Sequence, residues 1–218
     1  MCLIVFKPKG VKWDFDALEN GFWENPDGAG IMYQTKGGVR IEKGFTDPEV
    51  LIQLLEESPQ LVNVNVVVHF RYATHGTVGV ANCHPFPVAR EVGEEYSTLV
   101  DIGIAHNGII PGMRADTEKS DTVQYIENTL SGMKDKLFYK RTAKKLIKET
   151  FSKFAIMDKN RVNLIGEFIE DSGLYYSNEA YKCMPQLPAT ECSMAKSFTQ
   201  YDTAINGFDW ANWEYGKK

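Results

Sequence analysis

The first seven residues read MCLIVFK (Met1 to Lys7), an apolar run in which a cysteine directly follows the initiator methionine. Its apolar, β-forming residues predict a buried strand over Cys2–Phe6. On this stretch alone, Cys2 is either a small apolar residue at the edge of a strand or a reactive thiol. If Met1 is removed, Cys2 also carries a free α-amino group, and the rest of the chain has to distinguish the two hypotheses.

Short strands recur along the chain. Besides the first, strands are predicted at residues 30–34, 39–42, 64–70, 99–105, 153–157, 161–166 and 173–177. Gly37-Gly38 and residues 158–160 are typical of turns between antiparallel neighbours. Few helices separate these strands, so the pattern favours an α+β fold, in which helices cover antiparallel sheets, over a doubly wound parallel sheet.

Three helices are predicted. The first begins at the capping box Thr46-Asp47-Pro48-Glu49. The second begins at the N-cap Ser120 and runs to about Leu130. The third covers residues 142–151, where Leu146, Ile147 and Phe151 share an apolar side and the lysines form a solvated face.

The length of 218 residues fits a single domain, and no repeat, low-complexity tract or domain boundary is visible within residues 1–218. Residues 180–218 are polar and irregular, but they contain Trp210, Trp213 and Tyr215. Three exposed aromatic side chains would form an unusual patch. We therefore expect this C-terminal tail to pack on the body of the domain.

Composition argues against several classes of protein. A net charge of −5 and a pI near 5.5 do not fit a nucleic-acid-binding surface. The apolar runs, such as residues 64–70, are too short to span a membrane, and the N-terminus lacks the basic region of a signal peptide. The cysteines are scattered, so a reducing cytoplasmic environment is expected rather than a disulfide framework: they are Cys2, Cys83, Cys183 and Cys192.

The four histidines fall in two segments, HFRYATHGTVGVANCHPF (69–86) and IAHNGII (104–110). Arg71 and Thr74 could hold a carboxylate, although a surface arginine in an ion pair fits the local sequence equally well. Asn107-Gly108 is typical of a tight turn, or it presents an amide and a backbone N–H to an oxyanion. Asp121 either complements a helix dipole or binds a substrate ammonium group.

Neither a metal nor a cofactor is expected. Successive histidines are separated by six, nine and twenty-two residues, and the sequence has no HxH or HExxH motif. A papain-like hydrolase is also disfavoured, because that class places its cysteine at the start of a helix well inside the chain.

Together, the motifs resemble those of the class II glutamine amidotransferases, which are N-terminal-nucleophile (Ntn) hydrolases. They occur in the family's order and spacing: Cys2, Arg71-Tyr72-Ala73-Thr74-His75-Gly76, Asn82-Cys83-His84-Pro85, His106-Asn107-Gly108 and Ser120-Asp121-Thr122. The similarity covers residues 2 to about 178 and is greatest to the smaller, stand-alone members. Residues 25–30 match the family's early glycine-containing loop more loosely, without its usual arginine. The resemblance implies a four-layer αββα sandwich of two antiparallel sheets.

The resemblance also implies a role for each matching residue. Cys2 would be the nucleophile, its own α-amino group the general base, and Asn107 and Gly108 the oxyanion hole. The substrate would be glutamine or another γ-glutamyl compound. The implied substrate-binding residues are Arg71 and Thr74 for the α-carboxylate, Asp121 and the Gly108 carbonyl for the α-ammonium group, and His75 and His84 close by.

Three functions remain open at this point. The first is a glutaminase that passes ammonia to a synthetase in trans, because the tail is too short to hold a second catalytic domain. The second is a free-standing hydrolase of γ-glutamyl amide bonds in a larger compound. The third is a non-catalytic interaction protein that keeps the fold. The joint retention of Cys2, Arg71, Asn107, Gly108 and Asp121 argues against this third hypothesis. The sequence does not decide whether Met1 is removed.

Overall fold

The computed structural model describes residues 2–74, 76–114 and 118–182, and the structural statements below concern these residues. Of the predicted C-terminal tail, only residues 180–182 are among them. The expected packing of residues 180–218, and the aromatic residues on which it rests, lie outside the described part and stay a prediction.

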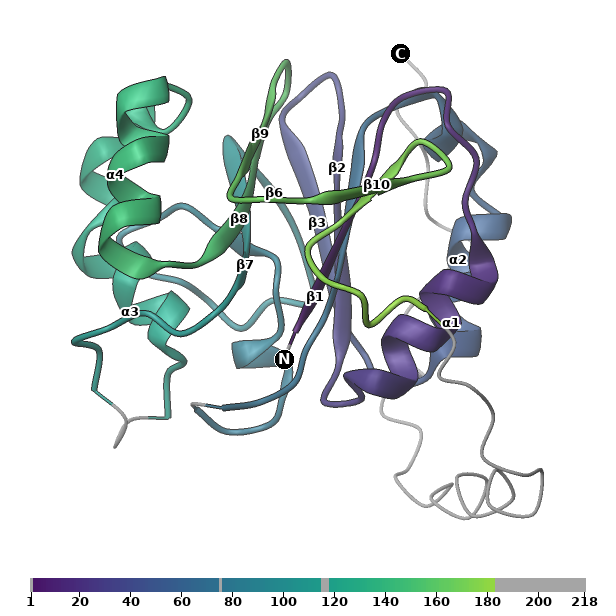
Figure 1. Ribbon diagram of the computed structural model, residues 1–218, viewed down its shortest axis with the longest axis horizontal. Coiled ribbons are helices and arrows are strands. Elements are labelled where there is room, and N and C mark those ends of the chain that lie inside the picture. The colour runs from purple at the N-terminus through teal and green to yellow at the C-terminus, as the bar shows by residue number, and fades with distance from the viewer. Residues whose placement is uncertain (1, 75, 115–117, 183–218) are drawn as a thin grey trace. The chain divides into compact units, whose positions relative to one another are not determined.

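Two antiparallel sheets form the centre of the structure (Figure 1). The larger has the strand order β10-β11-β1-β4-β2-β3-β6. Its strands are β1 (Leu3–Lys7), β2 (Ala29–Gln34), β3 (Val39–Phe45), β4 (Val66–Phe70), β6 (Ser97–Val100), β10 (Ile169–Asp171) and β11 (Leu174–Tyr176). The smaller has the order β5-β7-β8-β9, formed by β5 (Phe86–Pro87), β7 (Ile102–Asn107), β8 (Lys153–Asp158) and β9 (Val162–Ile165). Every strand pair in both sheets is antiparallel.

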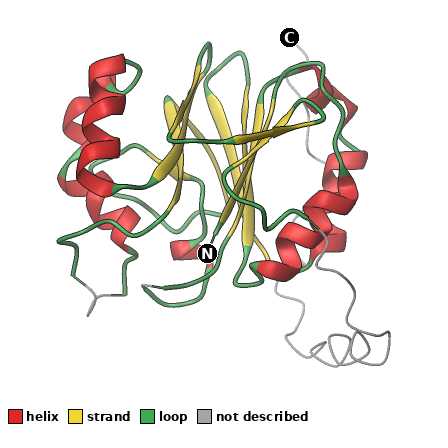
Figure 2. Ribbon diagram, in the orientation of Figure 1, coloured by secondary structure: helices red, strands yellow, loops and turns green. Residues whose placement is uncertain are grey.

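Helices flank the two sheets on opposite sides (Figures 1 and 2). On one side lie α1 (Phe15–Glu24) and α2 (Pro48–Glu56), and on the other lie α3 (Asp121–Asn128) and α4 (Lys140–Thr150). Short 3₁₀ helices cover Pro59–Asn63, Val80–Asn82 and Leu130–Lys136. The order helix, sheet, sheet, helix confirms the predicted α+β fold and its four-layer αββα arrangement.

Apolar side chains fill the space between the two sheets. Ile4, Met32 and Val67 of the seven-stranded sheet form one buried cluster with Ala105 and Met157 of the four-stranded sheet. Complete burial of a side chain of this size contributes about 1.5–3 kcal/mol. This contact between the sheets therefore stabilises the sandwich.

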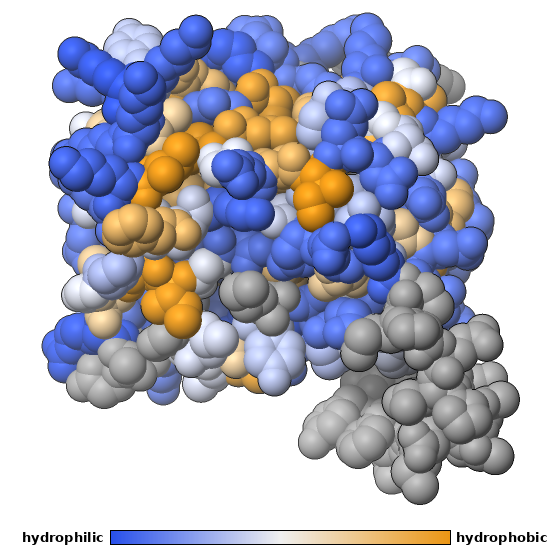
Figure 3. Space-filling model, viewed as in Figure 1, coloured by the Kyte–Doolittle hydropathy of each residue, from blue (hydrophilic) through white to orange (hydrophobic). Residues whose placement is uncertain are grey.

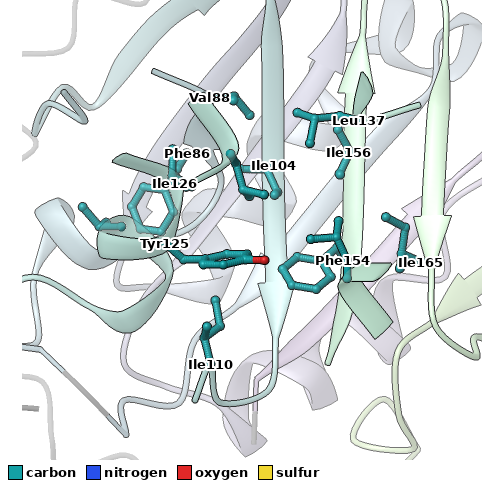
Figure 4. Close-up of a cluster of buried hydrophobic side chains, with 13 residues drawn as sticks. Phe86, Val88, Ile104, Ile110, Tyr125, Ile126, Leu137, Phe154, Ile156 and Ile165 are labelled. Atoms are coloured by element: carbon teal, nitrogen blue, oxygen red, sulfur yellow. The ribbon is translucent and has the colours of Figure 1, made fainter. Parts of the chain in front are cut away.

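A second cluster joins the four-stranded sheet to its helices. Figure 4 shows Tyr125 and Ile126 of α3 pointing into the same cluster as Ile104 and Phe154 of the sheet. Leu146 of α4 belongs to it as well. Helix α3, whose first residue is Asp121, is therefore fixed against the strand that ends at Asn107.

The predicted strands are confirmed, with one correction. Residues 99–105 were expected to form a single strand, but β6 ends at Val100 and β7 begins at Ile102. The two strands belong to different sheets, so the chain passes from one sheet to the other at Asp101. Helix α1 was not predicted; the side chain of Asp14 caps it by accepting from the backbone N–H of Ala17.

The helix predictions need two corrections. The N-cap of α2 is Asp47 rather than Thr46, since Asp47 Oδ1 accepts from the backbone N–H of Glu49 at 2.8 Å. In α4, Leu146 is buried as expected, but Ile147 is 40% exposed and Phe151 is 86% exposed. Phe151 does not share the buried side, because it is the C-cap residue and its φ of 53° turns the chain out of the helix.

The surface drawn in Figure 3 is largely hydrophilic, with several separate apolar patches. Scattered apolar side chains of this kind are ordinary on protein surfaces. In the part of the chain that the structure describes, every helix is too short or too polar to cross a bilayer.

Candidate active site

One small pocket, partly open to solvent, brings most of the predicted site residues together. Its lining includes Cys2, Arg71, Thr74, His84, Gly108 and Asp121. Tyr72, His106, Ser120 and Thr122 complete the wall. Asn107 is adjacent to Gly108 but does not line the pocket, and His75 lies outside the described residues.

Strand pairing explains why Cys2 and Arg71 meet. Strands β1 and β4 are antiparallel with Leu3 opposite Phe70, so the start of β1 lies beside the end of β4. Cys2 therefore faces the segment that follows β4. The Sγ atom of Cys2 lies 3.3 Å from the backbone nitrogen and 3.4 Å from the backbone oxygen of Tyr72.

The thiol of Cys2 is uncharged at rest. Burial raises its pKa, while the backbone N–H of Tyr72 and the charge of Arg71 act in the opposite direction. A neutral thiol is a weak nucleophile, so attack on a carbonyl carbon requires a base within reach.

A loop from the first third of the chain supports Arg71. The backbone N–H of Arg71 donates to Gly28 O at 2.8 Å, and Arg71 O accepts from the N–H of Asp27 at 3.0 Å. The carboxylate of Asp27 also accepts from the N–H of Ala73 at 2.7 Å. The loop of residues 25–30 thus holds the segment that carries Arg71 and Thr74, and is not part of the pocket lining.

Asp121 presents a buried carboxylate to the pocket. It is the first residue of α3, and the preceding Ser120 caps the helix as predicted. The Asp121 oxygens accept from the backbone N–H groups of Ile110 and Thr122, each at 2.7 Å. Among the described residues, none of the ion pairs includes Asp121. A buried carboxylate is stabilised by a partner of opposite charge, so a cationic group of a ligand would fit beside it.

Gly108 turns the chain from the end of β7 toward the pocket. Its φ is +147°, and a Cβ atom there would lie 2.2 Å from Ser152 Oγ. Only glycine therefore allows the backbone to pass this close to Ser152. The backbone of Gly108 is consequently held at one edge of the pocket, and the buried side chain of Asn107 donates to Ser177 Oγ at 2.8 Å.

Three buried histidines, His69, His84 and His106, lie next to one another, and the last two line the pocket. The ring of His84 stacks on His69 at a centroid distance of 4.2 Å and lies 6.2 Å from His106. His69 Nε2 donates to His106 O at 3.0 Å, and His106 Nδ1 pairs with Thr122 Oγ1 at 2.8 Å. Burial lowers the pKa of His69 to about 3 and also lowers the pKa values of His84 and His106. All three are neutral at physiological pH.

These histidines make stability depend on pH. Their folded pKa values lie below the ordinary value of 6.5, so the unfolded chain binds more protons than the native protein in acid. The contribution of the neutral rings is complete above about pH 6.5 and decreases as the pH falls. Urea unfolding at several pH values should show the unfolding free energy decreasing below about pH 6.5.

The control is His84→Phe, which keeps an aromatic ring between His69 and Phe86 but cannot take up a proton. Between about pH 5 and 6, we expect its unfolding free energy to depend on pH less steeply than the wild type, by about 1 kcal/mol per pH unit. An unchanged slope would mean that His84 is protonated in the native state.

Three polar residues near the pocket, Asn82, Ser177 and Asn178, have roles that their local sequence does not predict. Asn82 Nδ2 donates to Glu118 O at 2.6 Å, and Asn82 Oδ1 accepts from the N–H of Ser120 at 2.7 Å, so Asn82 ties two loops together. Ser177 and Asn178 contact Asn107 and Cys2, respectively. Ser177 and Asn178 directly follow the buried strand β11, and polar residues at the end of a buried strand are the sequence feature that could have identified them.

In the part of the chain that the structure describes, no group of three His, Cys, Asp or Glu side chains could hold a metal ion. The pocket instead combines a thiol, a guanidinium and a carboxylate. A small molecule with both an ammonium and a carboxylate group would complement these two charges. If such a molecule also carries a side chain with a carbonyl group, that group would lie beside the Cys2 thiol.

Comparisons with known proteins also point to amino-acid chemistry. The family model of class-II glutamine amidotransferases matches residues 5–133. A glutamine–fructose-6-phosphate aminotransferase (isomerizing) from Fusobacterium nucleatum is 31% identical over 104 residues, or 48% of this chain and 16% of that enzyme. The chain thus spans less than a fifth of the length of this curated relative.

Two solved structures are also similar. The glutamine phosphoribosylpyrophosphate amidotransferase from B. subtilis, complexed with ADP and GMP, is 16% identical with a TM-score of 0.47. A structure described as the allosteric regulatory enzyme of purine biosynthesis is 15% identical with a TM-score of 0.44. Each similarity covers 81% of this chain and 41% of the other.

Proposed function

This chain belongs to the class-II glutamine amidotransferase family, whose model matches residues 5–133, and on that premise we propose that it hydrolyses the side-chain amide of glutamine through a thioester on Cys2. The observation that carries the proposal is the meeting of Cys2, Arg71 and Asp121 in one pocket. These residues supply a nucleophile, a positive charge for an α-carboxylate and a negative charge for an α-ammonium group.

In this proposal, the backbone part of glutamine is bound through its two charges. Arg71 and Thr74 hold the α-carboxylate, since a guanidinium and a hydroxyl can share its two oxygens. Asp121 and the carbonyl of Gly108 bind the α-ammonium group. His84 closes the pocket behind the side-chain amide, and a contribution from His75 stays a prediction.

The reaction begins after removal of Met1. The α-amino group of Cys2, with an ordinary pKa of about 7.7–8.0, takes the thiol proton. Sulfur then attacks the carbonyl carbon of the side-chain amide (Cδ), and the amide oxygen becomes an oxyanion. The protonated amine returns its proton to the nitrogen, the C–N bond breaks, and ammonia leaves a γ-glutamyl thioester. Water, deprotonated by the same amine, releases glutamate and restores the thiol.

Two donors at the end of β7 would stabilise the oxyanion. They are the second N–H of the Asn107 side chain and the backbone N–H of Gly108. Hydrogen bonds to a developing negative charge are shorter and stronger than those to the neutral carbonyl of the substrate. Stabilisation is therefore greater in the transition state than in the ground state, which is the condition for raising kcat.

We further propose that the ammonia is consumed by a synthetase in trans. The relative from Fusobacterium nucleatum is named for transfer to fructose-6-phosphate, and the similarity covers 16% of its length. The acceptor for this chain is not named by that similarity. A cytoplasmic location is part of the same proposal, because a reducing compartment keeps scattered cysteines as free thiols.

Intact-mass spectrometry tests the proposed nucleophile. After treatment with a diazo-ketone analogue of glutamine, the purified chain should lack Met1 and carry one adduct on Cys2. Cys2→Ala should carry none. An adduct on Cys83, or no adduct on a chain that has lost Met1, would contradict the mechanism.

Assays of the same preparation identify the substrate. Ammonia release from glutamine that rises with an added synthetase supports the amidotransferase role. Turnover of a γ-glutamyl amine or peptide well above that of glutamine would instead identify a γ-glutamyl amide hydrolase.

A further inference from the structure

Ser177 makes four hydrogen bonds with three strands. It directly follows β11, and its side chain is fully buried. Its N–H donates to Ile4 O at 2.9 Å, and its Oγ accepts from the N–H of Ile4 at 2.9 Å. The same Oγ accepts from Asn107 Nδ2 at 2.8 Å, and the Ser177 carbonyl accepts from Lys153 Nζ.

These bonds connect the two sheets. Ile4 belongs to β1 in the seven-stranded sheet, whereas Asn107 and Lys153 are paired residues of β7 and β8 in the four-stranded sheet. Apolar contact is not directional, so the cluster between the sheets defines their relative position less sharply than hydrogen bonds do. The hydrogen bonds of Ser177 do fix this position, because they require defined distances and angles.

The next residue holds the nucleophile itself. Asn178 Nδ2 donates to the carbonyl of Cys2 at 2.8 Å. Two consecutive residues therefore bind two different residues of the candidate site. Asn178 binds the carbonyl of Cys2, and Ser177 binds the side-chain amide of Asn107.

We propose that Ser177 is a positioning residue that sets the Asn107 amide against the Cys2 thiol. The inference rests on the proposed function, in which Asn107 donates to the oxyanion. The Asn107 amide has two N–H groups, and Ser177 Oγ accepts one of them. This bond fixes the plane of the amide, so the second N–H keeps one direction without reorganising during the reaction.

The test compares Ser177→Ala with Ser177→Thr, which keeps the hydroxyl. Ser177→Ala is expected to lower kcat for glutamine about 10- to 100-fold, less than the 10²–10³-fold loss that follows removal of a donor. Its KM should stay within about twofold, because ground-state binding is unchanged. Ser177→Thr should recover most of kcat. Unfolding curves establish that each variant is folded at the assay temperature.

A double-mutant cycle separates positioning from general stability. If Ser177 acts through Asn107, adding Ser177→Ala to Asn107→Ala should reduce kcat by less than about threefold. A merely structural role would cost the same factor in both backgrounds. Binding of a γ-aldehyde analogue of glutamine gives a second measure, because thiol addition to the aldehyde creates an oxyanion-like oxygen. Its affinity should fall by the same factor as kcat.

Asn65→Ala is the matched control. The Asn65 side chain also joins two segments, accepting from the N–H of Lys9 at 2.9 Å and donating to Gln34 Oε1 at 2.8 Å. It precedes β4, at the end opposite Cys2. Its replacement should lower stability without changing kcat or aldehyde binding.

The possible failures can be told apart. If the wild type is active and Ser177→Ala is equally active, this inference is wrong and the proposed function stands. The same holds if Ser177→Ala lowers kcat by the same factor in the wild type and in the Asn107→Ala background. A wild type that has lost Met1 but releases no ammonia from glutamine would overturn both.

Discussion

Replacing Cys2 by alanine should abolish glutamine hydrolysis, with a loss of roughly 10⁴- to 10⁶-fold, as when other enzymes lose their nucleophile. Stability should change little, because Cys2 precedes β1 and its sulfur contacts only the backbone of Tyr72 among the described hydrogen bonds. Ammonia release measured beside urea unfolding separates the two effects.

Two comparisons sharpen this expectation. Cys83→Ala removes the other cysteine in the described part of the chain, which is buried outside the pocket lining, and should retain turnover. Protein that keeps Met1 has the same thiols but no free amine on Cys2, and should be inactive. Turnover by Cys2→Ala, or by protein that keeps Met1, would rule out the terminal cysteine mechanism.

Gly108→Ala should damage both the fold and the reaction. The new Cβ would lie 2.2 Å from Ser152 Oγ and 2.7 Å from Ser152 Cβ, at a φ of +147° that side chains rarely adopt. Overpacking and backbone strain together should lower the unfolding free energy by about 2–5 kcal/mol. Displacement of the Gly108 N–H should also reduce kcat by about 10²–10³-fold.

Gly112→Ala is the control for backbone strain alone. Gly112 has a φ of +81°, but a Cβ there meets no atom within 4 Å. Gly112→Ala should lower the unfolding free energy by about 1 kcal/mol and leave turnover unchanged. Urea unfolding of both variants gives the comparison. Equal stability of Gly108→Ala and Gly112→Ala would mean that the contact with Ser152 relaxes freely.

Much of the fold could be predicted from local patterns. Buried strands such as β1 and β4 are continuous apolar runs, and the turn at Gly37-Gly38 follows from residue type. Helix α1 could not be predicted from local patterns, because Gly21 within it is a poor helix former. The glycine reflects packing: a Cβ at Gly21 would lie 2.7 Å from Leu3 Cδ2, so the need for it arises only when the helix meets β1.

The candidate site was predicted where short motifs carry its chemistry. Arg71, Gly108 and Asp121 lie in such motifs, and the structure brings them to one pocket. Ser177 has no motif of its own, and its bond to Asn107 joins residues 70 positions apart. Contacts of this kind depend on how the two sheets are placed against each other, which no local pattern encodes.

The position of β1 between β4 and β11 has a consequence for biosynthesis. Translation delivers Cys2 long before Ser177, which binds Ile4, and Asn178, which binds the Cys2 carbonyl. Domains fold as units during synthesis, so Cys2 and Ile4 gain these hydrogen bonds only after residues 177 and 178 have been made. A nascent chain that stalls before Ser177 would carry Cys2 and Asn107 without these hydrogen bonds. The proposed hydrolysis therefore depends on synthesis of the chain through residue 178.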